Sequence, residues 1–189
     1  PGSTSFTFSF IWWGNSWKDG GVNKKIERNY LEINSLKDLK DTPISFDDYQ
    51  VQIVNPIDFQ LNRFFYKNIG KNHGWVDRLV WTDKQWKDYV SNSRVRTYIL
   101  KKEEDLAGYF ELIFHKDKNE VEIAYFGLLE EYHNKRIGGY LLSEAIKKSF
   151  LKEEIKRVWV HTCTLDHKNA LNNYLARGMI IYKKEKIKI

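Results

Sequence analysis

The chain has 189 residues, of which 42% are hydrophobic and 15% are aromatic, and it carries a formal net charge of +6. This length allows one well-buried core and disfavours a division into two domains. The single cysteine, Cys163, excludes an internal disulfide framework, and the five histidines have no cysteine partners at zinc-finger spacing. We therefore expect one domain without a structural metal, with the cytoplasm as its simplest compartment.

The positive charge would suit nucleic acid, an anionic membrane surface or a multiply phosphorylated cofactor. Its lysine-rich runs, such as residues 183–188, alternate with glutamate or apolar residues, which is typical of a solvated face. The most apolar early run, residues 6–13, is much shorter than the roughly 20 residues that a bilayer span requires. The sequence therefore predicts no membrane partner and makes nucleic acid the weaker candidate.

The first 28 residues form a segment of their own, aromatic and then glycine-rich, in which Phe6, Phe8 and Phe10 alternate. We predict an N-terminal arm or added strand over residues 1–28 and a single domain over residues 29–189. The arm could cover a cleft, extend a sheet or serve a subunit contact, and a homodimer is compatible with the sequence.

Residues 30–33 and 48–54 have the pattern of strands. Asn55 and Pro56 then supply an N-cap and a first-turn proline for a helix that should end at Gly70. The predicted buried face of this helix comprises Ile57, Leu61, Phe64 and Phe65. 

A second helix should begin after Thr82, because Thr82 and Gln85 match a capping box. Its inward-facing residues would be Trp86, Tyr89 and Val90.

Three strand-like runs follow at residues 95–101, 106–115 and 121–128, and they predict an antiparallel meander. Apolar residues at helical spacing from Ile137 then lead to a further strand at residues 158–163. This strand, helix, strand crossover predicts that residues 121–128 and 158–163 run parallel.

Asp166 is positioned to cap the next helix and Gly178 to end it, and a final strand should begin at Met179. The whole succession predicts an α/β (α+β) fold, with a mixed, mostly antiparallel central sheet flanked by helices.

The connection after residues 121–128 runs through a short acidic stretch into a glycine-containing turn that opens a helix. About four backbone N–H groups at a helix start lack partners, and they carry the positive end of the helix dipole. Such a turn can hold a diphosphate without any catalytic side chain.

The segments VEIAYFGLLEEYHNKRIGGYLL (residues 121–142) and DHKNALNNYLARGM (residues 166–179) together resemble the GNAT superfamily of acyl-CoA-dependent N-acyltransferases. The resemblance extends from Asp48 to about Tyr182, and residues 61–90 and 158–178 look like a bacterial GNAT subgroup without an assigned substrate. It implies acetyl-CoA as the cofactor. It also implies that the pantetheine arm lies where the sheet is splayed, between the strands of residues 121–128 and 158–163.

The family's turn pattern lands on His133, Arg136 and Gly138, of which Gly138 alone matches the usual residue. Arg136 stands where a glycine normally lets the backbone approach phosphate, and its side chain could take over that contact as a charge-assisted donor. The resemblance implies a cofactor-binding set that consists of Phe126, Gly127, Leu128, His133, Asn134, Lys135, Arg136, Ile137, Gly138, Gly139, Tyr140, His167, Asn169 and Asn173.

Two residues are implied in catalysis. Glu122 resembles the strand glutamate that serves some superfamily members as general base, and the alternative is a glutamate in a solvated hairpin. Tyr174, which stands with Ala170 and Gly178 at the family's spacing, resembles the tyrosine that donates to the departing sulfur, and the alternative is a core aromatic. The backbone N–H of Leu128 would polarise the thioester oxygen.

A dense aromatic and polar segment lies between the first two predicted helices, where superfamily members recognise their acceptors. Aromatic walls with one acid suit an amine-bearing ligand, whereas loop packing is the alternative. The predicted substrate-binding residues are His73, Trp75, Asp77, Arg78, Trp81 and, on a neighbouring strand, Glu111.

The sequence therefore favours an N-acetyltransferase that moves an acetyl group from acetyl-CoA to a primary amine by direct transfer, without a metal. One alternative is a CoA-binding regulatory module without turnover, which the unusual His133 and Arg136 motivate. The other is a basic nucleic-acid-binding protein, which rests on charge and aromatic content alone.

Overall fold

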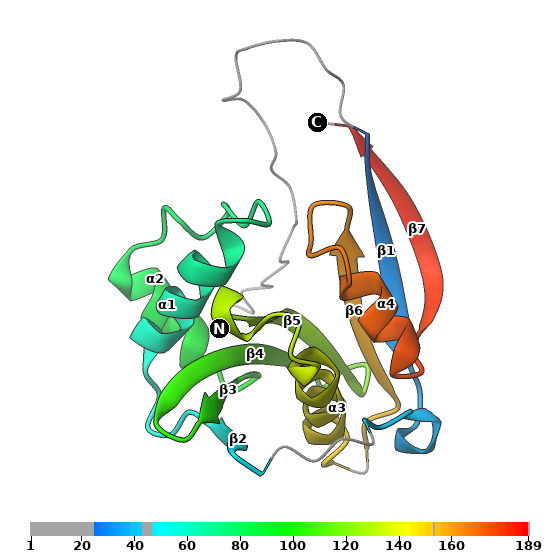
Figure 1. Cartoon of the computed structure of the whole chain (residues 1–189), viewed down its shortest axis with the longest axis horizontal. Helices are drawn as coiled ribbons and strands as arrows, with labels where there is room; N and C mark the ends of the chain where they lie inside the picture. The colour runs from blue at the N-terminus through cyan, green and yellow to red at the C-terminus, as the bar shows by residue number, and fades with distance from the viewer. Residues whose placement is uncertain (1–24, 43–46, 153, 189) are drawn as a thin grey trace, which may run out of the picture.

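A seven-stranded sheet runs through the molecule in the order β2-β3-β4-β5-β6-β1-β7 (Figure 1). The computed structural model describes residues 25–42, 47–152 and 154–188. The alternating Phe6, Phe8 and Phe10 of the predicted arm lie outside the described residues. The strands are β1 (Lys25–Ile33), β2 (Tyr49–Ile53), β3 (Val95–Lys102), β4 (Asp105–His115), β5 (Glu120–Leu128), β6 (Arg157–Cys163) and β7 (Ile180–Lys188).

Strand pairing confirms the predicted meander, since β3, β4 and β5 pair antiparallel in succession. It also confirms the crossover, because β5 and β6 pair parallel. β1 lies between β6 and β7 and is antiparallel to both, so the first described strand joins the last two of the chain. It begins before residue 28, and the predicted division at residues 28 and 29 stays a prediction.

In the part of the chain that the structure describes, four α-helices cover the two faces of this sheet. They are α1 (Phe59–Gly70), α2 (Asp83–Val90), α3 (Ile137–Ser149) and α4 (Ala170–Ala176), with short 3-10 turns η1 (Leu36–Asp38) and η2 (Glu130–Tyr132). No helix in the described ranges is long and apolar enough to cross a bilayer.

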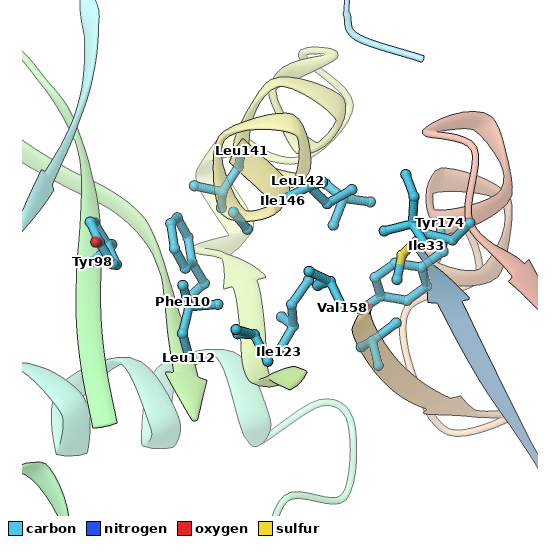
Figure 2. Packing of buried hydrophobic residues seen from close by; sticks show 14 of the residues in the cluster. Ile33, Tyr98, Phe110, Leu112, Ile123, Leu141, Leu142, Ile146, Val158 and Tyr174 are labelled. Atoms are coloured by element: carbon cyan, nitrogen blue, oxygen red, sulfur yellow. The ribbon is translucent and has the colours of Figure 1, made fainter. Parts of the chain in front are cut away.

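The larger core lies between the sheet and α3 and α4. Side chains of α3, such as Leu141 and Ile146, face Phe110 and Ile123 of the sheet (Figure 2), and all four are almost completely buried. On the opposite face, Phe65 of α1 stacks on Tyr109 of β4, with ring centroids 4.9 Å apart. Because successive strand residues point to opposite faces, the two cores share the same strands.

The predicted start of α1 was wrong. The helix begins at Phe59 with Asp58 as its N-cap, and a carboxylate oxygen of Asp58 accepts the Gln60 N–H at 2.9 Å. The buried face also differs from the prediction, since Phe64 is 40% exposed and the polar Asn62 is buried together with the predicted Phe65. Ile57 precedes the helix and is also exposed.

The capping box that begins α2 is confirmed, with both reciprocal hydrogen bonds between Thr82 and Gln85. The predicted inward residues of α2, Trp86, Tyr89 and Val90, are all buried.

The predicted cap at Asp166 was wrong. Asp166 accepts hydrogen bonds from the Thr162 hydroxyl and the Cys163 N–H, so it closes the turn after β6. α4 begins later, with Asn169 at its N-cap position.

Candidate active site

β5 and β6 pair over three residues and then separate. The paired residues are Glu120 with Arg157, Val121 with Val158, and Glu122 with Trp159. Beyond them β5 continues to Leu128 while its other edge stays paired with β4. Figure 1 shows the result, with β2 to β5 on the left and β6, β1 and β7 diverging on the right.

A bulge in β5 lies just beyond this point. Leu112 pairs with Ile123 and Glu111 pairs with Tyr125, which leaves Ala124 without a partner in the register. A bulge bends the strand that carries it and increases its twist. We attribute the separation of β5 from β6 to this bend.

The unpaired edge of β5 offers backbone donors toward β6. The Leu129 N–H donates to the Ala107 carbonyl oxygen at 2.9 Å, on the β4 side. Successive N–H groups of a strand point to opposite edges, so the Leu128 N–H points away from β4. It therefore has the direction that a donor to a thioester oxygen would need.

The helix α3 opens immediately after this edge. Its N-cap, Arg136, has left-handed backbone angles (φ 61°) and makes no side-chain cap hydrogen bond, and the first turn contains no acidic residue. Gly138 and Gly139 present backbone without side chains there. The Asn173 amide donates to the Gly138 carbonyl oxygen at 3.0 Å, which holds α4 against this turn.

The predicted cofactor-binding residues from Phe126 to Tyr140 lie along this edge and turn, and His167, Asn169 and Asn173 lie before and on α4. Ile137 is 1% exposed and belongs to the core. The Asn173 amide is already engaged by α3. The His133 Nε2 donates to the Leu128 carbonyl oxygen at 3.0 Å, so this ring braces the turn.

Three histidines from different loops meet beside the same opening. The ring of His167 lies 4.9 Å from that of His133 and 6.2 Å from that of His73. Burial and the neighbouring His133, His73 and Lys168 together lower the pKa of His167, so its ring is neutral at pH 7. Within the described residues, no three His, Cys, Asp or Glu side chains are arranged to hold a metal ion.

Glu122 occupies the last paired position before the strands separate, and it is 7% exposed. Its carboxylate lies 3.1 Å from the His115 Nε2, and the His115 ring stacks near Trp159 of β6. His115 was absent from the predicted site. His115 pairs with Glu120 and is two register positions from Glu122 on the same face of the sheet, and this hairpin pairing is the sequence signal that could have identified it.

Tyr174 lies on the buried side of α4, 6% exposed, with its ring 6.3 Å from that of Phe126 on β5. Burial, and to a smaller extent Asp166, raises the pKa of its hydroxyl far above the usual value. The hydroxyl therefore keeps its proton at neutral pH and is able to donate it.

The predicted acceptor residues Glu111 and Arg78 are both buried and engage each other. Glu111 is 0% exposed, and its carboxylate accepts from the Arg78 guanidinium at 2.9 Å. The Tyr89 hydroxyl at 2.7 Å and the Asn62 amide at 2.7 Å donate to the same carboxylate. Glu111 therefore has no free charge to offer a ligand while this network is intact.

Aromatic rings enclose the Arg78 guanidinium. Its central carbon lies 4.1 Å from the ring centroids of Tyr89 and Tyr125 and 4.7 Å from that of Trp81. Burial by itself disfavours the cation, but Glu111 together with the surrounding tyrosines outweighs it, and the pKa of Arg78 is raised. Trp81 thus packs on an internal cation.

Asp77 is the exposed acid of this segment. Its carboxylate accepts from the Tyr66 hydroxyl at 2.6 Å and from the Tyr125 hydroxyl at 3.1 Å. Trp75 packs edge-on against Tyr125, with centroids 4.9 Å apart. Asp77, Trp75 and His73 are therefore the predicted acceptor residues that remain accessible beside β5.

Residues 59–179, more than half of the chain, match the acetyltransferase (GNAT) family. The chain belongs to this family. No curated protein sequence matches the chain.

Solved structures share the GNAT fold at low sequence identity. A GCN5-related N-acetyltransferase from Kribbella flavida is 11% identical over 87% of this chain and 60% of its own, with a TM-score of 0.62. One from Sphaerobacter thermophilus is 13% identical over 87% of this chain and 52% of its own, with a TM-score of 0.64. This GNAT chain thus spans three fifths or less of the length of these two proteins.

A spermidine N-acetyltransferase from Vibrio cholerae, in complex with CoA and spermine, is 13% identical. The match covers 76% of this chain and 96% of that one, with a TM-score of 0.58. At such identities the likeness shows the fold, and it agrees with the predicted mixed, mostly antiparallel sheet flanked by helices.

Proposed function

We propose that this GNAT chain moves an acetyl group from acetyl-CoA to a primary amine by direct transfer. One observation carries the proposal: β5 and β6 separate after Glu122, and the uncapped first turn of α3 follows at the end of the separated edge. Unpaired strand amides suit an amide-containing arm, and a helix start with glycines suits a diphosphate. Family membership supports acyl transfer in general.

In this proposal, backbone groups of Phe126, Gly127 and Leu128 hold the pantetheine arm, and the α3 turn holds the diphosphate. Bound acetyl-CoA would supply the acyl group as a thioester. The Leu128 N–H would donate to the developing oxyanion, which stabilises charge where it forms. The Tyr174 hydroxyl, protonated at neutral pH, would donate to the departing sulfur.

We assign Glu122 as the base that takes the proton from the attacking amine, directly or through a water. Its support is position, because it is the last residue of β5 before the opening and its carboxylate is nearly buried. His115, at 3.1 Å, would hold that carboxylate in one orientation. A fixed base close to the reacting amine is what general base catalysis requires.

For the acceptor we propose a cationic amine that approaches over Asp77. Arg78 neutralises Glu111, whereas the Asp77 carboxylate is exposed beside Trp75 and Tyr125. An acid flanked by aromatic faces suits an ammonium group. The similar spermidine N-acetyltransferase, solved with spermine, is consistent with such an acceptor.

The test has two stages. Calorimetry with CoA should show binding in the absence of any acceptor, and failure to bind would end the proposal. A panel of amines is then screened for acceptor-dependent release of free thiol from acetyl-CoA. Tyr174→Phe should bind CoA like the unaltered protein and lose about 10²- to 10⁴-fold in turnover. Binding without turnover on a broad panel would instead support the regulatory module.

A further inference from the structure

The side chain of Arg177 lies against the first turn of α3 and has no protein anion as a partner. Its Nε is buried and makes no hydrogen bond, and no ion pair to Arg177 is found among the described residues. A Cβ built at Gly139 would collide with the Arg177 Nη1, so the guanidinium covers this glycine. A buried N–H donor without a partner is rare in proteins and calls for a physical reason.

The position of Arg177 is firmly held by its backbone. Its N–H donates to the carbonyl oxygens of Asn173 and Tyr174 at the end of α4, and its carbonyl oxygen accepts the Lys40 N–H at 3.0 Å. The Asn173 amide fixes α4 against Gly138. The guanidinium therefore reaches the α3 turn from a fixed backbone position, although Arg177 is far from Gly139 in the sequence.

Two sources of positive potential thus lie side by side. The first turn of α3 presents backbone N–H groups, with no acidic residue and no side-chain cap, and the Arg177 guanidinium stands beside them. Like charges repel, so this arrangement is best satisfied by an anion between them. Arginine presents donors in a planar fork that matches phosphate, and such charge-assisted hydrogen bonds are stronger than neutral ones.

We propose that Arg177 binds a phosphate group of the nucleotide half of coenzyme A, together with the amides of the α3 turn. This inference rests on the proposed function, since it presupposes a CoA thioester as the donor. A bound phosphate would give the Nε donor a partner. Arg177, at the end of α4, would also supply an anion contact in a turn where Arg136 replaces the glycine that usually lets the backbone approach phosphate. Two groups share this chemistry, the diphosphate and the 3′-phosphate, and the experiment separates them.

The experiment is calorimetric binding of CoA, 3′-dephospho-CoA and pantetheine to the whole chain without acceptor. Arg177→Met should weaken CoA binding about 10- to 100-fold. It should leave the binding of pantetheine, which carries no phosphate, unchanged. An equal loss with CoA and 3′-dephospho-CoA assigns Arg177 to the diphosphate, and a loss confined to CoA assigns it to the 3′-phosphate. Arg177→Met that binds CoA as tightly as the unaltered protein overturns the proposal.

Two further variants keep the outcome interpretable. Lys156→Met removes one exposed positive charge before the start of β6, at the end of the strand away from the α3 turn, and should bind CoA normally. Gly139→Ala adds a Cβ that displaces the flexible end of Arg177 without removing its charge, so it should also weaken binding. Combined with Arg177→Met it should add little, because both act on one contact. Fully additive losses would count against the contact.

The melting temperature of each variant without ligand separates binding from folding. If Arg177 only packs on α3, Arg177→Met should lower the melting temperature and leave CoA affinity intact. If the unaltered protein binds no CoA at all, the proposed function fails first, and this failure is visible before any variant is made.

Discussion

The two sides of this GNAT domain differ in whether their buried charged and donor groups have protein partners. Under α1 and α2, the charges of Arg78 and Glu111 are buried and satisfied by each other and by Asn62 and Tyr89. Around the start of α3, backbone amides and the Arg177 Nε are left without protein partners. The charged groups under α1 and α2 thus have protein partners, although the Tyr109 hydroxyl there has none, whereas the donors at the start of α3 are open to an anion.

This difference separates residues that shape the site from residues that face it. Arg78 anchors the segment between α1 and α2, and the adjacent Asp77 is held at Tyr66 and Tyr125 as a result. In the proposed function, the Arg78 and Glu111 pair would therefore act on an acceptor indirectly, through the position of Asp77. The predictions below test whether the first region is structural and the second functional, beginning with the largest effect.

Arg78→Met should be the most destabilising change. It leaves the fully buried Glu111 without its cation, and breaking a buried pair in this way costs about 3–5 kcal/mol of unfolding free energy. Denaturant unfolding followed by circular dichroism measures this loss. The double variant Arg78→Met, Glu111→Gln should recover a large part of it, because no buried charge then remains unpaired.

A matched control is the exposed pair between Arg63 and Asp83, at 2.6 Å. Arg63→Met should cost less than about 1 kcal/mol, as is usual for surface pairs. If Arg78→Met were no more destabilising than Arg63→Met, the network around Glu111 would not hold the fold together. The Arg78 and Glu111 region would then not be the structural region in this comparison.

Glu122→Gln should reduce turnover about 10²- to 10⁴-fold while CoA affinity stays unchanged, because the change removes a proton acceptor and keeps the shape of the side chain. Steady-state thiol release and calorimetry measure the two quantities separately. Glu120→Gln is the control, since Glu120 lies two residues earlier on β5 and pairs with Arg157. Equal losses in both variants would argue that strand charge, rather than a base at the opening, supports turnover.

Much of the fold follows from local patterns. The α3 turn, the capping box at Thr82 and the strand pattern of the meander each depend on residues within a few positions of one another. The placement of β1 between β6 and β7 depends on pairing with strands from the other end of the chain, which no local sequence pattern indicates.

The errors in the sequence analysis have the same origin. Asn55 and Asp58 both suit an N-cap, and α1 begins after Asp58. Asn62 is buried on this helix, where its amide donates to Glu111 of β4 at 2.7 Å. The anchoring role of Arg78 and the position of Arg177 over Gly139 likewise arise from packing between distant segments. A charged residue in a predicted binding segment can form an internal ion pair or contact a ligand, and its position in the sequence does not distinguish the two.

Lowering the pH should destabilise the histidine cluster beside the α3 turn. The pKa of His167 is lowered in the folded protein, by burial and by His133, His73 and Lys168, so the unfolded chain binds more protons below the usual histidine pKa. The contribution of neutral His167 to the unfolding free energy is therefore fully present above about pH 6.5, and it is lost as the pH falls below that value.

Urea unfolding between pH 5 and 8 measures this slope, and His167→Gln should make it shallower. Some slope should remain, because burial and Arg28 also lower the pKa of His161. A slope that is the same with and without His167 would show that folding does not lower the pKa of His167. The histidine cluster would then not be part of the contrast between the α3 side and the α1 and α2 side.

The smallest effect should come from Arg136→Gly. Arg136 adopts φ 61° at the N-cap of α3, a conformation that costs a residue with a Cβ about 1–2 kcal/mol and costs glycine little. Part of the gain is offset by the greater freedom of glycine in the unfolded chain, so the unfolding free energy should rise by about 0.5–1 kcal/mol. Asn134→Gly, at φ 60°, is the matched control and should change the unfolding free energy less, because asparagine tolerates this region.

The unfavourable backbone conformation of Arg136 would be offset if its exposed guanidinium beside the turn contributed to anion binding. The same variant should therefore bind CoA more weakly at low salt while it unfolds later, whereas a gain in both stability and affinity would mean that Arg136 contributes nothing to the anion site.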